Sequence, residues 1–146
     1  IDGFEASIAR DVLGWQAALG LSLIDPRDRD TGHTLPYRAR RTLSLDLDRQ
    51  FGAFGVGGTW RAVSQRYDDA ANTRELSGYG VLDLRTSWLA SDEIRFDLKL
   101  DNALDRDYTL GDYLRPTSPT DYVGEARPYR EPGRTALLAV TWTPEL

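Results

Sequence analysis

Apolar and polar residues alternate with a period of two along most of this chain. In the clearest segment, Ile94-Arg95-Phe96-Asp97-Leu98-Lys99-Leu100-Asp101, every even position is apolar and every odd position is charged. Because successive side chains of a β-strand point to opposite faces of the sheet, this alternation predicts strands with one apolar and one polar face. No segment sustains the spacing of three and four residues that an amphipathic helix requires. The chain is therefore predicted to be all-β.

Seven segments carry the pattern and predict an antiparallel meander. The expected strands are residues 2–10, 14–24, 37–49, 52–67, 78–90, 93–104 and 134–143. Several of them approach or exceed the roughly 9–11 residues that a tilted strand needs to cross a bilayer. The fourth strand contains Gly52, Gly55, Gly57 and Gly58. Glycines inside a strand mark strong curvature or a close approach of two backbones.

The connections between these strands alternate strictly between short and long. The short ones are residues 10–13, 48–51 and 90–92, and the long, polar ones are residues 25–35, 68–77 and 105–133. In a meander this order places every long loop at one end of the sheet and every tight turn at the other. Outer-membrane barrels show this asymmetry, with short periplasmic turns and long extracellular loops.

Large aromatic residues concentrate near both ends of the expected strands. Trp15, Phe51, Trp88 and Trp142 lie toward the short turns, and Trp60, Tyr67, Tyr79 and Tyr108 lie toward the long loops. Two such girdles are expected where amphipathic rings meet two membrane–water interfaces. The alternative is a soluble β-barrel or β-sandwich binding module that holds a small apolar ligand inside. The girdles, loop asymmetry and strand lengths favour the membrane barrel.

Seven strands do not close an ordinary bacterial outer-membrane barrel, which has an even number of strands. An open sheet in lipid would leave the N–H and C=O groups of its edges unpaired, at several kcal/mol each. We therefore expect either an eighth strand or a larger barrel of which these residues are one part.

Composition narrows the class of function. The 146 residues contain 18 Lys and Arg, 23 Asp and Glu, no Cys and a single histidine, His33, with a net charge of −5. The negative charge argues against nucleic acid as a partner. The absence of Cys and the lone His argue against thiolate or histidine metal sites and against a Ser-His-Asp triad. No nucleophile–base pair or phosphate-binding glycine loop is evident, so we do not expect an enzyme.

The C-terminal third contains less generic residues. The run Leu98-Lys99-Leu100-Asp101-Asn102-Ala103-Leu104-Asp105-Arg106-Asp107-Tyr108 resembles the penultimate-strand motif of TonB-dependent outer-membrane receptors, in which Asn-Leu-Phe/Leu-Asp-x-x-Tyr leads into the last extracellular loop. Ala103 and Leu104 occupy the positions of the apolar pair of that motif. The segment from Pro132-Gly133-Arg134-Thr135 into Leu137-Leu138-Ala139-Val140-Thr141-Trp142 resembles the entry to the closing strand.

Two upstream runs resemble the same family in the same order. Ile1-Asp2-Gly3-Phe4-Glu5-Ala6 is similar to a recurrent strand opening, and Leu35-Pro36-Tyr37-Arg38-Ala39-Arg40-Arg41 is similar to a basic run that begins a later strand. The resemblance implies that these residues form the C-terminal third of a 22-stranded transmembrane barrel. It also implies an N-terminal plug domain and earlier strands outside this chain. The implied partners are that remainder of the receptor, the TonB complex acting through the plug, the barrel-assembly machinery, and outer-membrane lipid.

Within that family, the compact loops and the run Tyr67-Asp68-Asp69 after the glycine-rich strand look most like cobalamin receptors. The resemblance thus implies an outer-membrane uptake receptor for cobalamin or another large, scarce nutrient. This chain would supply barrel wall, three extracellular loops and the closing strand.

The candidate substrate-binding residues are loop aromatics. Tyr67, Tyr108, Tyr113 and Tyr122 are expected near a loop-lined mouth, where they would contact a large amphipathic ligand. Interfacial anchoring or packing between loops is the alternative role.

Calcium is the one cofactor for which the sequence offers candidates. Carboxylate oxygens at close spacing suit that ion, and the candidate ligands are Asp25, Asp28, Asp30, Asp68 and Asp69. A solvated loop and simple turn formation are the alternatives. On the polar face, Arg95, Asp97, Lys99 and Asp101 predict a salt-bridge ladder in the lumen rather than a general acid/base pair.

The C-terminal residues carry a candidate assembly signal. Outer-membrane proteins of this kind often end in an aromatic residue that the assembly machinery reads, and this chain ends Trp142-Thr143-Pro144-Glu145-Leu146. Trp142 is the candidate aromatic, and Pro144 prevents the short tail from extending the strand ladder.

Overall fold

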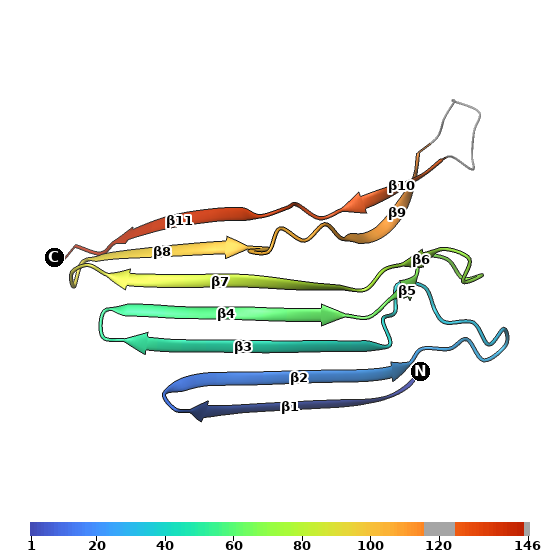
Figure 1. Cartoon of the computed structure of the whole chain (residues 1–146), viewed down its shortest axis with the longest axis horizontal. Helices are drawn as coiled ribbons and strands as arrows, with labels where there is room; N and C mark the ends of the chain where they lie inside the picture. The colour runs from blue at the N-terminus through green and yellow to red at the C-terminus, as the bar shows by residue number, and fades with distance from the viewer. Residues whose placement is uncertain (116–124, 145–146) are drawn as a thin grey trace.

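Seven long strands lie side by side in a single antiparallel sheet (Figure 1). The computed structural model describes residues 1–115 and 125–144. The sheet consists of β1 (Asp2–Val12), β2 (Trp15–Asp25), β3 (Arg41–Phe51), β4 (Phe54–Val63), β7 (Tyr79–Leu89), β8 (Ile94–Asp101) and β11 (Thr135–Trp142), in the order β1-β2-β3-β4-β7-β8-β11. The predicted all-β meander is therefore confirmed.

The strands differ from their expected bounds where the backbone leaves the ladder. The third begins at Arg41 rather than residue 37, because Tyr37 follows a proline and has a φ of 58°. The fourth ends at Val63 rather than residue 67, and Arg66–Tyr67 forms a separate short strand, β5. The sixth ends at Asp101 rather than residue 104, because Asn102 has a φ of 49°. Backbone in the left-handed region does not continue an extended ladder.

Two small hairpins lie within the long connections and were not expected from the sequence. β5 pairs with β6 (Glu75–Leu76), and β9 (Thr109–Arg115) pairs with β10 (Glu125–Arg130). The second of them lies within the long, polar connection expected from residue 105 to residue 133. In Figure 1 both hairpins lie at the end of the sheet opposite the short turns.

The short turns are tight hairpins. Leu13 and Gly14, both with positive φ, join β1 to β2 between the paired residues Val12 and Trp15. Two such residues form the turn whose twist matches that of antiparallel strands. Gly52 and Ala53 join β3 to β4 in the same two-residue span. The chain alternates between these turns and the long connections, as predicted.

The register places most of the large apolar strand residues on one face. Leu45, in the middle of β3, pairs with Leu19 on one side and Trp60 on the other, and Trp60 pairs with Leu82. At the far edge Leu98 pairs with Leu138. This apolar face is open to the surroundings: the exposed fraction is 64% for Leu138 and 67% for Trp142.

Little of the described chain is buried. Leu76 and Val81 are its two buried aliphatic side chains, and no second layer packs on either face of the described sheet. No helix in the described residues is both long enough and apolar enough to cross a membrane. A soluble sandwich or closed ligand-binding barrel would bury the apolar face in its own core, which this sheet does not do.

Candidate functional site

The long connections gather at one end of the sheet and form the outer loops, here defined as residues 26–40, 64–78 and 102–134 (Figure 1). The first and second loops are joined by a reciprocal pair of hydrogen bonds. The Thr34 amide donates to Asn72 Oδ1 at 2.7 Å, and Asn72 Nδ2 donates to the Thr34 carbonyl at 2.8 Å. Beside them, His33 Nδ1 lies 3.0 Å from the Ala70 carbonyl oxygen. These bonds fix the first two loops against each other.

Asp68 contacts all three loops. Its carboxylate accepts the backbone N–H of Asp112 at 3.0 Å in the third loop and pairs with Arg74 in its own loop at 3.1 Å. The hydroxyl of Tyr37, in the first loop, donates to the same carboxylate, and this hydrogen bond raises the pKa of Tyr37. Asp68 is buried, with 5% of its surface exposed. The residue is therefore the charged centre of the outer loops.

Arg66 makes a second link between the second and third loops. Its Nη2 donates to the carbonyl oxygens of Thr109 and Leu110, both at 2.9 Å. Its guanidinium carbon lies 5.5 Å from the ring centroid of Tyr79, and that ring stacks on Tyr108 at 4.4 Å. Arg66 is buried, and its Nη1 has no hydrogen-bond partner among the described residues.

The four predicted substrate-contacting tyrosines are only partly placed by the structure. Tyr67 is half-buried, and its carbonyl accepts the Tyr37 amide at 2.7 Å. Tyr108 is half-buried against Tyr79, and burial together with the Glu131 carboxylate raises its pKa. The backbone of Tyr113 lies in β9, whereas its side chain and all of Tyr122 lie outside the described residues. Their contact with substrate stays a prediction.

The five predicted calcium ligands do not converge, and several of them have other partners. Asp25 pairs with Arg27 at 3.0 Å, and Asp68 pairs with Arg74 as described above. Asp28 accepts the amide of Asp30 at 2.8 Å, which lowers the pKa of Asp28. In the part of the chain that the structure covers, no three possible metal-binding side chains come together. Calcium binding stays a prediction.

Asp69 forms a turn of its own within the second loop. Its carboxylate accepts the backbone N–H groups of Arg74 at 2.8 Å and Thr73 at 3.0 Å, and the hydroxyl of Thr73 at 2.7 Å. These bonds stabilise the charged form and lower the pKa of Asp69 to about 2.

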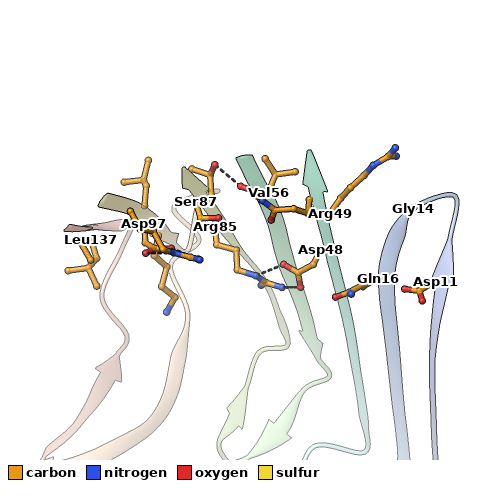
Figure 2. Close-up of a pocket in the computed structure, with 17 residues that line it drawn as sticks. Asp11, Gly14, Gln16, Asp48, Arg49, Val56, Arg85, Ser87, Asp97 and Leu137 are labelled. Carbon is orange, nitrogen blue, oxygen red and sulfur yellow. Dashed lines mark hydrogen bonds and ion pairs between the residues drawn. The ribbon is translucent and has the colours of Figure 1, made fainter. Parts of the chain in front are cut away.

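The polar face of the sheet carries a network of ion pairs. Arg85 on β7 donates from Nε to Asp48 on β3 at 2.8 Å (Figure 2). Its Nη2 donates to Asp46, on the same strand, at 2.8 Å. These pairs cross β4, where Gly57 stands between Asp48 and Arg85 in the register. A Cβ at Gly57 would overlap Asp48 Oδ1, so a side chain there would block the pair. The glycine allows the close approach that its position in a strand predicted.

The predicted ladder on β8 is confirmed. Arg95 Nη2 lies 2.8 Å from Asp97 Oδ1, and Lys99 Nζ lies 2.8 Å from Asp101 Oδ1. Arg85, Asp97 and Lys99 line a hollow of about 770 Å³ on this face. The acids and bases neutralise one another pairwise, which suits a hydrated wall rather than proton transfer.

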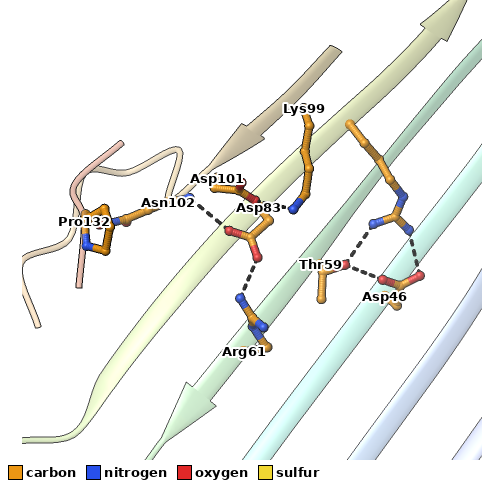
Figure 3. Close-up of polar contacts among 9 residues, drawn as sticks. Asp46, Thr59, Arg61, Asp83, Lys99, Asp101, Asn102 and Pro132 are labelled. Carbon is orange, nitrogen blue, oxygen red and sulfur yellow. Dashed lines mark hydrogen bonds and ion pairs between the residues drawn. The ribbon is translucent and has the colours of Figure 1, made fainter. Parts of the chain in front are cut away.

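The motif that followed β8 in the sequence forms a set of loop caps. Asn102, 4% exposed, donates from Nδ2 to the Arg106 carbonyl at 2.9 Å and accepts the Arg106 amide at 2.8 Å. Its own amide donates to Asp83, which also pairs with Arg61 at 2.7 Å (Figure 3).

Asp105 caps the entry to the last strand. Its Oδ1 accepts the amide of Arg134 at 2.8 Å, and a Cβ at Gly133 would lie 2.8 Å from that same oxygen. The Asn-x-x-Asp and Gly-Arg elements thus hold the two ends of the third loop together.

Near the short turns, Trp142 Nε1 donates to Glu93 at 3.3 Å. The ladder extends one bond beyond Trp142, where the Thr143 amide donates to the Glu93 carbonyl at 2.8 Å, and Pro144 follows. Trp88 stacks between Phe54 and Phe96 on the apolar face, with centroid distances of 5.8 and 5.5 Å. The expected aromatic girdle at this end is present.

An amphipathic antiparallel sheet with tight turns at one end and interlocked loops at the other defines the wall of an outer-membrane-type barrel. Residues 1–111 match the family model described as TonB dependent receptor-like, beta-barrel. The chain therefore belongs to the TonB-dependent receptor β-barrel family. It is a bacterial outer-membrane protein, as the resemblance implied.

Solved structures share the fold. The siderophore receptor PiuA from Acinetobacter baumannii aligns over 97% of this chain and 21% of its own, with 19% identity and a TM-score of 0.76. The ferric yersiniabactin uptake receptor FyuA from Yersinia pestis aligns over 96% of this chain and 24% of its own, with 20% identity and a TM-score of 0.73. The ferric-catecholate import receptor Fiu from E. coli K12, in its open form, aligns over 96% of this chain and 20% of its own, with 23% identity and a TM-score of 0.72. The chain spans about a fifth to a quarter of the length of these receptors.

Proposed function

We propose that this chain is the C-terminal third of a 22-stranded barrel whose complete receptor takes up a large, scarce nutrient in a TonB-dependent manner. The observation that carries the proposal is the combination of the family match with a sheet that has tight turns at one end and interlocked outer loops at the other. The chain supplies barrel wall, three outer loops and the closing strand.

The sheet edges support this assignment. The outer edges of β1 and β11 have no neighbour among the described strands. In a membrane such edges must be paired, because unpaired backbone groups in hydrocarbon cost several kcal/mol each. β11 would pair with the first strand of the barrel, and β1 with the strand that precedes it. Trp142 at the end of β11 would serve as the signal for the barrel-assembly machinery.

We propose cobalamin as the nutrient. The support is the likeness of the compact loops and of Tyr67-Asp68-Asp69 to cobalamin receptors, and Asp68 is the centre on which those loops are built. The mouth would bind the ligand through loop aromatics. The plug would then move under the action of the TonB complex at the periplasmic face.

The test uses the complete receptor, purified in detergent, with cyanocobalamin and an iron(III)–catecholate complex as alternative ligands. We expect saturable binding of cyanocobalamin and none of the catecholate. Binding of the iron complex alone would overturn the cobalamin assignment and keep the receptor assignment. In cells, uptake that persists without TonB would overturn the proposed mechanism.

The position of the chain in the barrel is tested separately through β11. Removal of Thr135–Trp142 should abolish assembly of the receptor, measured as loss of the heat-modifiable folded band on a gel. Trp142→Ala should slow assembly without changing the final fold. Normal assembly of the receptor without β11 would show that another strand closes the barrel.

A further inference from the structure

Arg49 is a charged residue on the apolar face. It lies in β3 in the same alternation as Leu45 and Leu47, and it pairs with Val56 across the ladder. Its guanidinium carbon lies 4.6 Å from the ring centroid of Phe51 and 5.7 Å from that of Trp15. Arg49 is thus held between two aromatic rings of the girdle at the short-turn end of the sheet.

The N–H groups of this guanidinium are not used within the described chain. Its neighbour Asp48 points to the opposite face and pairs with Arg85, whereas Arg49 extends toward Gly14 (Figure 2). Among the residues of the structure, no carboxylate and no hydrogen-bond acceptor contacts the Arg49 side chain. Stacking on aromatic rings uses only the faces of the planar group and leaves its five edge donors available. A guanidinium at the level of the aromatic girdle, with its edge donors available, is expected to bind an anionic group.

An apolar hollow lies next to Arg49 on the same face. Its volume is about 350 Å³, and its lining includes Trp15, Leu47, Gly58, Trp60 and Leu84. Gly58 stands between Leu47 and Leu84 in the register, so the missing side chain leaves the space. Leu47 precedes Arg49 by two residues on the same face of β3, which places the hollow one step nearer the middle of the membrane.

We propose that Arg49 and the hollow over Gly58 form a binding site for an anionic glycerophospholipid of the leaflet on the short-turn side. The guanidinium binds the phosphate through its free edge, and the rings of Trp15 and Phe51 hold it in place. An acyl chain lies in the hollow, against Leu47 and Leu84. The short turns face the periplasm in barrels of this kind, so the leaflet is the periplasmic one. Planar, bidentate donors favour phosphate as the partner.

The experiment measures retention of lipid by the complete receptor in detergent, by native mass spectrometry, with phosphatidylglycerol and phosphatidylcholine as separate probes. The wild-type receptor should retain phosphatidylglycerol preferentially. Arg49→Gln should lower that retention about five-fold, as expected for one basic side chain at an anionic membrane surface. Arg49→Lys keeps the charge but loses the planar stacking, so its retention should lie between the two.

Two further variants separate the headgroup from the hollow. Gly58→Leu fills the hollow and should weaken both lipids equally. The added Cβ would lie 3.1 Å from Leu84 Cδ2, the movable end of a flexible side chain, and 3.3 Å from the Asp83 carbonyl oxygen, so the folded state of this variant is checked first by its heat-modifiable band. Arg95→Gln removes a cation from the opposite face, where it pairs with Asp97, and should change neither lipid. Equal retention of the two lipids by the wild type, or unchanged phosphatidylglycerol retention in folded Arg49→Gln receptor, would overturn the proposal.

Discussion

Replacement of Asp68 by asparagine removes the negative charge at the centre of the outer loops. The asparagine oxygen can still accept the Asp112 amide, but the charge opposite Arg74 is lost, and the Tyr37 hydroxyl meets a weaker acceptor. Hydrogen bonds to a charged group contribute about 1.5–3 kcal/mol, and a pair with an exposed partner up to about 1 kcal/mol. The side chain of Arg74 is 46% exposed, so its pair belongs to the weaker class. We expect the third loop to be destabilised against opening by about 2 kcal/mol.

The assay is hydrogen exchange of the complete receptor, read by mass spectrometry over residues 109–115. A change of about 2 kcal/mol corresponds to roughly 30-fold faster exchange through opening. Asp69→Asn is the matched control, because the contacts of Asp69 stay within its own turn, and it should leave this segment unchanged. Equal protection of residues 109–115 in Asp68→Asn and wild type, with β1–β4 intact, would refute a central role for this carboxylate.

Three further predictions concern the two faces and the second loop. Leu98→Arg, on the apolar face, should lower the free energy of unfolding by about 2–4 kcal/mol near the membrane midplane, whereas Lys99→Arg, on the polar face, should leave it almost unchanged. Unfolding of the receptor in vesicles measures both variants. Equal tolerance of the two substitutions would contradict the assignment of Leu98 and Lys99 to opposite faces. Arg85→Gln should lower the free energy of unfolding by about 1–3 kcal/mol, because it leaves Asp46 and Asp48 without their shared cation. Arg95→Gln should lower it by less than about 1 kcal/mol, because its ion pair is exposed. The same unfolding measurement compares the two variants, and equal losses would argue against a cluster in which Arg85 is shared. The pKa of Asp69 is lowered from 3.8 to about 2 on folding, so the contribution of its carboxylate to the stability of the second loop is complete above about pH 4 and is lost as the pH falls through 2. Pepsin cleavage within residues 68–77 should therefore increase over that pH window in the wild type. In Asp69→Asn this pH dependence should be lost.

The strands were predictable because the signal that defines them is local. In Ile94–Asp101 the alternation of charged and apolar residues is complete, and the register of β8 with β11 follows it. The two-residue strands β5 and β6 were not predictable, because two residues show no periodicity. Their pairing depends on the turn between them, which is built by contacts of Asp69.

Only part of the role of Asp68, the charged centre of the outer loops, could be predicted from the sequence. Asp68 was singled out as a carboxylate, but as a calcium ligand, because its partners could not be inferred from spacing. The amide it accepts is 44 residues away in the chain. Arg66 and Asn72 were not predicted as contacts between loops for the same reason, and Tyr37 was noted as part of a basic run and not as a partner of Asp68. The Asn102 motif was recognised through family resemblance, and its physical role as a loop cap follows only from its contacts.

The arginines of the barrel wall differ in whether they occupy an apolar or a polar position of the strand pattern. This difference predicts their partners better than their sequence distance from acidic residues does. Arg49 and Arg85 both have an aspartate nearby in sequence or register, yet within the part of the chain that the structure describes only Arg85 pairs with an aspartate. Arg85 occupies a polar position, where Asp46 and Asp48 share its face across Gly57. Arg49 occupies an apolar position two residues from the end of β3, so its adjacent aspartate lies on the other face. An arginine at an apolar position near the end of a transmembrane strand therefore indicates an interfacial cation, and its partner is to be sought in the membrane rather than in the barrel.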